Sequence, residues 1–164
     1  MNFIVAADLD YGIAKDGGLL ASLPKDLQFF KEKTLGNIVI MGRKTLESLP
    51  RQKPLPGRTT LILSRSPQYT CENAVVLRSA EEVLAWIADR QIPAERVFVC
   101  GGAEIYQLFM PHCQTGYLTK IYHRFGADRH IENIEQDPRW WEASRSPRQE
   151  ENGYAYEWII YRRK

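Results

Sequence analysis

A carboxylate and an aromatic side chain stand four residues apart in the segment PKDLQFFKEKT, at Asp26 and Phe30. If this segment is helical, both project from the same face, one turn apart. The pair suits a flat nitrogen heterocycle, because the ring packs on the aromatic side chain while an amidine-like edge donates two hydrogen bonds to the carboxylate. A structural interpretation also fits, in which Asp26 complements the helix dipole and Phe30 belongs to the core.

A second candidate site is VIMGRKT, where an apolar run ends at Gly42 and is followed by Arg43 and Lys44. A helix that begins here would present unpaired backbone N–H groups and a positive dipole end, and the two cations would add charge where a phosphate could bind. Glycine would let the backbone approach a ligand closely. The alternative is an ordinary glycine turn followed by solvated basic residues.

A similar junction follows in VFVCGGAEIY, where Gly101-Gly102 precedes a predicted helix. It lacks the G-x-G-x-x-G spacing of the ordinary dinucleotide fingerprint and is weak by itself. Two such junctions in one small sheet are a stronger signal, because a pyrophosphate could be held between two helix N-termini. Arg65 is a candidate to bind a 2′-phosphate. Arg58 follows the rigid turn PLPG and is a candidate to bind a ligand carboxylate. Each arginine alone could equally be a surface residue.

Alternating strands and helices are predicted to position these residues. Short runs rich in β-branched residues predict strands, and amphipathic stretches predict helices. Asp10 to Ser22, with three glycines, predicts a long loop. The predicted strands are 3–7, 38–41, 60–64, 75–77, 97–100 and 116–122. The predicted helices are 24–33, a short one from Arg43, one capped by Ser79 with Glu82 at capping-box spacing, and 103–110.

This order predicts an α/β fold with a mostly parallel central sheet, helices on both faces and an antiparallel C-terminal hairpin formed by 140–144 and 154–161. Ligands in such sheets bind at the carboxyl ends of the strands. The chain of 164 residues has no repeat or linker, so residues 1–164 are predicted to form one domain. Four tryptophans lie within apolar patterning and are predicted to pack in the core: Trp86, Trp140, Trp141 and Trp158.

Composition narrows the class of protein. The formal net charge of +2 is too small to argue for nucleic acid or an anionic membrane as a partner. The opening MNFIVAADLD has no basic leader, and no stretch approaches the length of a membrane span. Cys71, Cys100 and Cys113 lack metal-ligand spacing, which indicates reduced thiols in a cytoplasmic protein without a metal site.

In this order and spacing the motifs resemble those of dihydrofolate reductases, and the likeness covers essentially the whole chain. The matching stretches are IVAAD, GIAKDGGLLASLPKDLQFFKEKT, VIMGRKTLESLP, PLPGRTTLILSR, VFVCGGAEIYQLFMP, YLTKIYH and the aspartate of ADRH. The resemblance implies NADPH-dependent reduction of 7,8-dihydrofolate to tetrahydrofolate, by a monomer that binds antifolate inhibitors.

The resemblance also implies roles for individual residues. Asp26 would bind the amino edge of the pterin and aid its protonation, Thr119 would hydrogen-bond Asp26, and Arg58 would clamp the α-carboxylate of the glutamate tail. The other substrate-binding residues would be Val5, Ala6, Leu27, Phe30, Leu49, Leu55 and Cys100. The cofactor would contact Ala7, Ile13, Leu19, Gly42, Arg43, Lys44, Thr45, Leu63, Ser64, Arg65, Gly101, Gly102, Ala103, Glu104, Ile105 and Tyr106. The Gly101-Gly102 bond would be cis, and the loop from Leu9 to Leu23 would close over the nicotinamide.

Three positions depart from the family pattern. Leu20-Ala21 replaces a proline–tryptophan pair whose tryptophan packs the loop against the pterin and orders water, which puts loop closure and rate in doubt. Gly12-Ile13-Ala14 replaces the usual GIG, a smaller change that would stiffen the loop. Glu104 stands where an arginine is often found, so phosphate binding must depend on Arg43 and Arg65.

Two other functions remain open at this point. A reductase of pyrimidine intermediates in riboflavin synthesis has a similar fold, but its substrate carries a ribosyl phosphate and would not require Asp26, Phe30 and Arg58 together. A non-catalytic pterin or nucleotide binder descended from the enzyme would fit the missing loop tryptophan, whereas the intact Asp26 argues against it.

Overall fold

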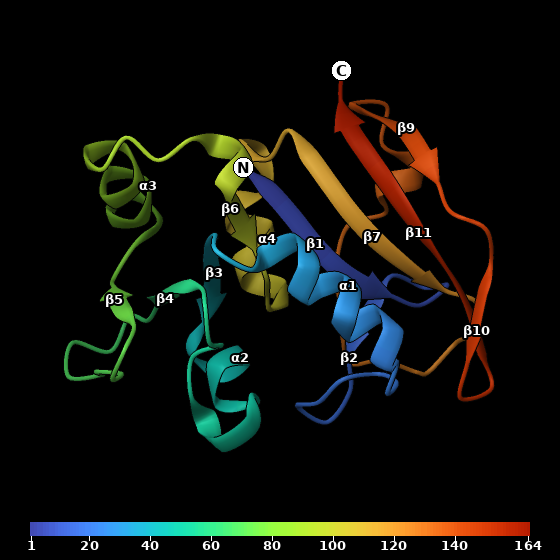
Figure 1. The fold of residues 1–164 in the computed structure, drawn as a ribbon, viewed down its shortest axis with the longest axis horizontal. Coiled ribbons are helices and arrows are strands. Elements are labelled where there is room, and N and C mark those ends of the chain that lie inside the picture. Colours follow the sequence, from blue (N-terminus) through green and yellow to red (C-terminus); the bar gives the residue numbers. More distant parts are fainter.

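The computed structural model describes residues 1–164, which form a nine-stranded sheet, a two-stranded ribbon and four α-helices (Figure 1). The strands are β1 (Asn2–Ala7), β2 (Gly12–Ala14), β3 (Ile38–Gly42), β4 (Thr59–Leu63), β5 (Val75–Leu77), β6 (Val97–Val99), β7 (Thr115–Ile121), β8 (Arg129–His130), β9 (Trp140–Arg145), β10 (Gln149–Glu151) and β11 (Tyr154–Arg163). The helices are α1 (Pro24–Thr34), α2 (Arg43–Glu47), α3 (Ala80–Asp89) and α4 (Ala103–Phe109).

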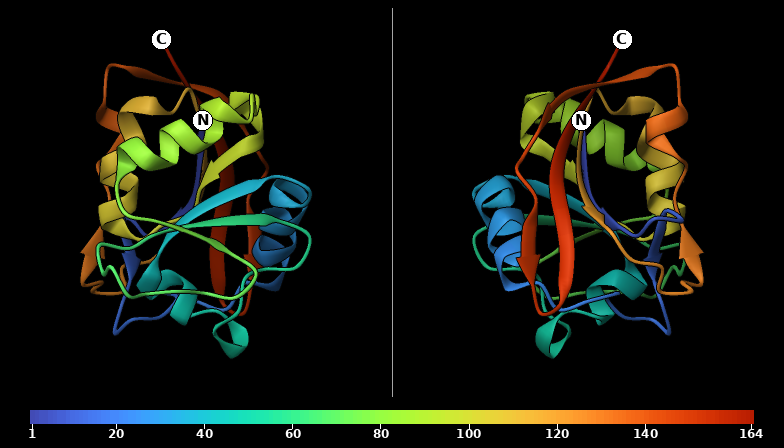
Figure 2. Two further views of the ribbon diagram at one scale, coloured as in Figure 1. Left: turned by 90° about the vertical axis from the view of Figure 1, so that its left-hand side faces the viewer. Right: turned by 90° about the vertical axis from the view of Figure 1, so that its right-hand side faces the viewer.

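The large sheet has the strand order β10-β11-β7-β1-β6-β3-β4-β5, with β9 also paired to β11. The six strands from β7 to β5 in this order run parallel, and β11 is antiparallel to β7, β9 and β10. The predicted α/β class, with an antiparallel C-terminal edge, is confirmed. Helices α3 and α4 lie on one side of this sheet and α1 on the other (Figure 2).

The predicted C-terminal hairpin has two strands, whereas the structure has three, because β10 lies between β9 and β11 in the chain. The tight hairpin joins β10 to β11 through Asn152 and Gly153, both with positive φ, as two-residue hairpin turns require. Strand β9 pairs instead with the far part of β11, from Ile159 to Arg163. Because β11 has ten residues, its outer edge is long enough to hold two partner strands in succession.

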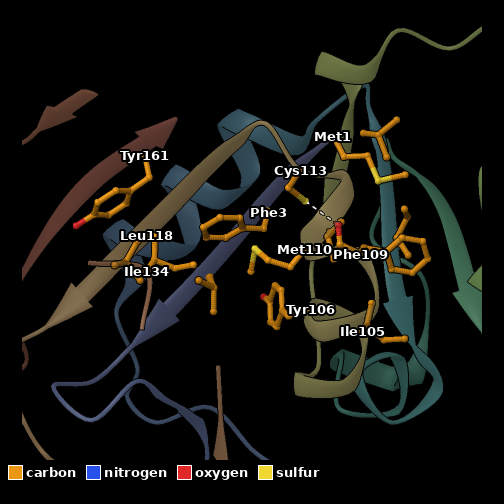
Figure 3. Close-up of a cluster of buried hydrophobic side chains, with 14 of the residues drawn as sticks. Met1, Phe3, Ile105, Tyr106, Phe109, Met110, Cys113, Leu118, Ile134 and Tyr161 are labelled. Atoms are coloured by element: carbon orange, nitrogen blue, oxygen red, sulfur yellow. Dashed lines mark hydrogen bonds between the residues drawn. The ribbon is translucent and has the colours of Figure 1, made fainter. Parts of the chain in front are cut away.

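Side chains along the central strands alternate between two apolar clusters, as a sheet covered on both faces requires. On β1, Phe3 and Val5 join the large cluster beneath α3 and α4, whereas Ile4 joins the cluster beneath α1 and α2. Figure 3 shows the large cluster, with Phe3 from β1 on one side of α4 and Phe109 from α4 itself on the other. All three cysteines are free thiols.

Most predicted element boundaries differ from the observed ones by one residue. The predicted loop from Asp10 to Ser22 contains β2, which pairs with β8, and neither strand has enough residues to show a period in the sequence. Ser79 caps α3 by accepting from the backbone N–H of Glu82, but the Glu82 carboxylate accepts from the N–H of Arg78 instead of completing the box at Ser79. None of the helices combines the length and apolar character that crossing a membrane would need.

Candidate active site

Asp26 lies in the first turn of α1, just after Pro24, which is well suited to a helix start. Its Oδ1 atom accepts a hydrogen bond of 2.6 Å from Thr119 Oγ1 and one of 2.9 Å from Trp158 Nε1. Thr119 belongs to β7 and Trp158 to β11, and the two residues are direct cross-strand partners. Both donors use Oδ1, so Oδ2 is the oxygen that remains available to a ligand.

Burial raises the pKa of Asp26 above its ordinary value. The hydrogen bonds from Thr119 and Trp158 act in the opposite direction because they stabilise the charged form, and the Glu151 carboxylate raises the pKa further. A carboxyl group poised in this way can either carry a negative charge opposite a cationic edge or hold a proton, which is the property expected of an acid–base group.

The hydrogen bond from Thr119 to Asp26 that the resemblance implies is present. Among the predicted pterin contacts, Phe30, Leu49 and Cys100 are brought together, because all three pack against the apolar cluster beneath α1 and α2. Leu27, also on α1, is 52% exposed and lies outside that cluster. The remaining predicted substrate residues are the buried Val5 and the half-buried Ala6 on β1, and the half-buried Leu55 in the loop before β4.

Core packing was the wrong prediction for Trp141, which is 47% exposed on β9. Trp158 is half-buried and packs against an apolar cluster as predicted, but its indole N–H also donates to Asp26, which was not predicted. Trp140 is buried edge-on against Phe3, and Trp86 packs against the large cluster. Apolar periodicity identifies the apolar face of a strand, but it does not tell whether that face is covered by the core or borders a ligand site.

A cleft of about 450 Å³ lies near the C-terminal end of α1, and it is lined by Lys31, Leu35, Pro56, Gly57 and Arg58. The Nε atom of Arg58 is buried and has no hydrogen-bond partner. Since Asp26 and Lys31 are five residues apart on α1, they are about 7.5 Å apart along the helix axis. An elongated ligand can therefore lie along α1, with a nitrogen-rich head at Asp26 and an anionic tail at Arg58.

The two glycine-to-helix junctions lie side by side, because β3 and β6 are neighbours in the sheet. The backbone N–H of Gly42 donates to the carbonyl of Gly101 at 2.9 Å. A Cβ on Gly42 would come within 3.2 Å of Ile105, and a Cβ on Gly101 would come equally close to the ring of Tyr106. The Gly101-Gly102 bond is cis, as the resemblance implies. Glycine at both junctions therefore allows close packing against α4, and the two junctions together form a backbone cradle at this edge of the sheet.

Charged side chains surround this cradle. Arg43 lies over the ring of Tyr69 at 4.4 Å, and Arg65 Nη2 forms an ion pair of 2.7 Å with Glu104 Oε1. Arg65 follows β4 and Glu104 opens α4, so their ion pair spans the carboxyl end of β3, which lies between β4 and β6. Both side chains are exposed and can exchange partners when an anion binds.

Several other predicted cofactor residues are largely buried. Ala7 is 1% exposed, and Tyr106 donates its hydroxyl to the carbonyl of Ile4 at 2.6 Å. The hydroxyl of Ser64 accepts from the N–H of Ser66. The rest lie around the same edge of the sheet, with Leu63 and Ile13 packed against the large cluster, Thr45 and Ala103 half-buried, and Lys44 exposed.

Arg78 was not identified from the sequence. Its guanidinium donates to the backbone carbonyls of Ser64, Pro67 and Tyr69 and so fastens the loop that follows β4 and carries Arg65. A single arginine in the stretch LRSAEE matches no motif, so the sequence offered no signal for this role.

The loop from Leu9 to Leu23 is anchored at its start by Asp8. This residue is 2% exposed, and its carboxylate accepts from the N–H groups of Asp10, Gly12 and Phe125. Further along the loop, the N–H of Asp16 donates to the carboxylate of Asp128, the aspartate of the ADRH stretch. Leu19, another predicted cofactor contact, is 74% exposed at the loop surface.

The fold and this site together define the class of α/β oxidoreductases that use a nicotinamide nucleotide. The family model described as dihydrofolate reductase matches residues 1–163. The dihydrofolate reductase of Bacillus subtilis (strain 168) is 37% identical, covering 100% of this chain and 95% of the relative. The dihydrofolate reductase of Staphylococcus haemolyticus is 32% identical, and the match covers 99% of this chain and 95% of that relative. A solved dihydrofolate reductase from Enterococcus faecalis, complexed with NADP(H) and RAB-propyl, aligns with a TM-score of 0.87 and 36% identity over 99% of this chain and 95% of that one. The chain belongs to the dihydrofolate reductase family.

Proposed function

We propose that this chain catalyses the NADPH-dependent reduction of 7,8-dihydrofolate to 5,6,7,8-tetrahydrofolate. The observation that carries the assignment of the site is the arrangement along α1. A half-buried carboxylate with one free oxygen stands at one end, and the unpartnered Nε of Arg58 stands at the other. A pterin with a glutamate tail has the matching chemistry, with hydrogen-bond donors at one end and carboxylates at the other.

Asp26 pairs through Oδ2 with the amino edge of the pterin and orients the ring. Bound NADPH supplies the hydride, so the main task of the protein is to hold the two rings in contact. Protonation of the ring nitrogen next to the accepting carbon makes that carbon more electrophilic. Asp26 would promote this step, with water carrying the proton to the nitrogen.

The remaining substrate contacts are proposed on the family pattern. Phe30 and Leu27 pack against the pterin and its benzoyl tail, with Leu49 and Leu55 on the opposite wall. The strands contribute Val5, Ala6, Cys100 and Thr119, and Arg58 binds the α-carboxylate of the tail. The antifolate-bound relative supports extending this site to antifolate inhibitors.

The cofactor site is proposed at the glycine cradle. Arg43, Lys44 and Thr45 would hold one part of the phosphate chain and Gly101 to Tyr106 another, while Ser64 and Arg65 would bind the 2′-phosphate, which favours NADPH over NADH. Gly42 allows close approach of the backbone, and Ala7, Ile13, Leu19 and Leu63 complete the contacts. The active-site loop would close over the nicotinamide and exclude bulk water.

The decisive experiment is the loss of NADPH absorbance when purified protein meets dihydrofolate, with NADH measured alongside. Rapid oxidation that requires dihydrofolate and prefers NADPH is expected. Oxidation that instead requires a ribosyl-phosphate pyrimidine would support the reductase of riboflavin synthesis. Tight NADPH binding without oxidation of either substrate would support a non-catalytic relative.

We further propose that residues 1–164 act as one domain, as a monomer in the cytoplasm and without a nucleic-acid partner. The net charge of +2 and the three free thiols support this picture. Light scattering at assay concentrations should give the monomer mass of 19.0 kDa, and a single unfolding transition is expected. A dimer mass or two separate transitions would contradict the proposal.

A further inference from the structure

A tryptophan on the sheet contacts the Asp26 carboxylate. Trp158 of β11 donates from Nε1 to Asp26 Oδ1 at 2.9 Å. Ala21 and Trp158 pack against the same small cluster, which includes Leu23 and Tyr156. The active-site loop and the indole of β11 therefore share one apolar cluster.

We propose that Trp158 is a positioning residue for Asp26 and fixes the orientation of its carboxylate from the sheet. The inference rests on the proposed function for its catalytic consequence, and on the geometry alone for the anchoring itself. Trp158 acts through Asp26 and need not contact the substrate.

The indole of Trp158 is held on several sides. It stacks on Phe29 with ring centroids 5.0 Å apart and an interplanar angle of 14°, and it meets Tyr156 nearly edge-on at 5.6 Å. The backbone N–H of Trp158 donates to the hydroxyl of Ser146 at 2.9 Å, and its carbonyl accepts from the N–H of the same residue at 2.8 Å. None of these contacts comes from the active-site loop, so the direction of the indole N–H is set by α1 and the sheet.

Two fixed donors on one oxygen restrain the carboxylate of Asp26. Thr119 and Trp158 both bind Oδ1, so rotation about the bond between Cβ and Cγ would break two hydrogen bonds at once. Oδ2 accepts no hydrogen bond from the protein and is left for a ligand. Because hydrogen bonds to the ionised form favour ionisation, loss of the indole N–H also makes Asp26 easier to protonate.

The test is Trp158→Phe, which keeps an aromatic ring for Phe29 and removes the N–H donor together with part of the indole. The matched control is Trp140→Phe, because Trp140 Nε1 is buried without a hydrogen-bond partner and the same substitution there breaks no such bond. The hydride step consumes a proton, so its rate falls as pH rises. Trp158→Phe should move this alkaline limb up by about one pH unit and raise KM for dihydrofolate, whereas the limb should not move in the control.

A second measurement does not depend on catalysis. The ¹³Cγ resonance of Asp26, assigned by its loss in Asp26→Asn, is titrated in the ligand-free protein. We expect the titration midpoint to move upward in Trp158→Phe and to stay unchanged in Trp140→Phe. Thr119→Val, which removes the other donor, is the reference for the size of the shift. An unchanged midpoint in Trp158→Phe would overturn the inference. If the midpoint moves but wild-type protein does not reduce dihydrofolate, the anchoring stands and the proposed function is wrong.

Discussion

Thr119 and Trp158 face each other across β7 and β11, and both donate to the same oxygen of Asp26. Directly opposed residues of an antiparallel pair project from the same face of the sheet, which is why two distant segments can converge on one atom. A register shift of one residue on β11 would turn Trp158 to the other face of the sheet. The position and hydrogen bonding of the Asp26 carboxylate therefore depend on the register of β11 and β7 as well as on α1.

Asp26→Asn tests the catalytic assignment. The amide keeps the shape of the side chain but removes the negative charge and the exchangeable acid proton. We expect hydride transfer to fall roughly 10²- to 10⁴-fold, the usual contribution of an acid–base group. NADPH binding and the circular dichroism spectrum should stay unchanged. Turnover equal to wild type would exclude the role assigned to Asp26.

The same variant should be more stable than wild type at neutral pH. Because burial raises the pKa of Asp26 in the folded state, the native protein binds more protons than the unfolded chain above the ordinary value of 3.8. The free energy of unfolding of wild type therefore falls as pH rises from 3.8 to the folded-state pKa, and Asp26→Asn removes this loss. Thermal melts should show a gain for the variant that disappears in acid, whereas Glu72→Gln, at an exposed carboxylate, should show none.

Arg58→Gln tests the tail-binding cleft. Loss of a guanidinium that binds a carboxylate should raise KM for dihydrofolate roughly ten- to a hundredfold and leave kcat nearly unchanged, because the tail is bound equally in the ground and transition states. A reduced pterin without the glutamate tail is the matched control. If Arg58→Gln raised KM for that truncated substrate as much as it raises KM for dihydrofolate, the placement of the tail would be wrong.

Glu104→Gln tests the charges at the cofactor cradle. Glu104 pairs with Arg65 and adds a negative charge near the proposed phosphate contacts. The variant should bind NADPH about two- to fivefold more tightly, because Arg65 no longer pairs with Glu104 and is free to bind the phosphate. The gain is small because an exposed ion pair has a small interaction energy. Fluorescence titration should show this gain for NADPH but not NADH, and it should fade at high ionic strength. An equal gain for both nucleotides would place the 2′-phosphate elsewhere.

Tyr106→Phe should destabilise the protein. The Tyr106 hydroxyl donates to the carbonyl of Ile4 at a buried position between α4 and β1. Its removal leaves that carbonyl without the donor, at a cost of about 1–3 kcal/mol in the free energy of unfolding. Urea denaturation measures the change, and Tyr69→Phe, which alters a half-buried ring outside this contact, provides the comparison. Equal stabilities would mean that water replaces the hydroxyl.

Local sequence patterns determined the position of most helices and strands and of the glycine junctions. The α1 helix with Asp26 in its first turn, the junctions at Gly42 and Gly101, and the parallel strands leading to them follow from apolar periodicity and glycine placement. These features are readable because they depend on residues within one or two turns of one another. The family motifs added the hydrogen bond from Thr119 to Asp26, which no local pattern supplies.

Tertiary structure alone decided which groups surround the carboxylate. Thr119 is 93 residues from Asp26 in the chain and Trp158 is 132 residues away. In the sequence, Trp158 has the same apolar neighbours as a core residue, and only the pairing of β11 with β7 places its N–H on Asp26. The double pairing of β11 and the ribbon of β2 and β8 were likewise not readable from local patterns. Strand register is set by long-range packing and turn geometry, so it becomes defined only when the whole sheet assembles.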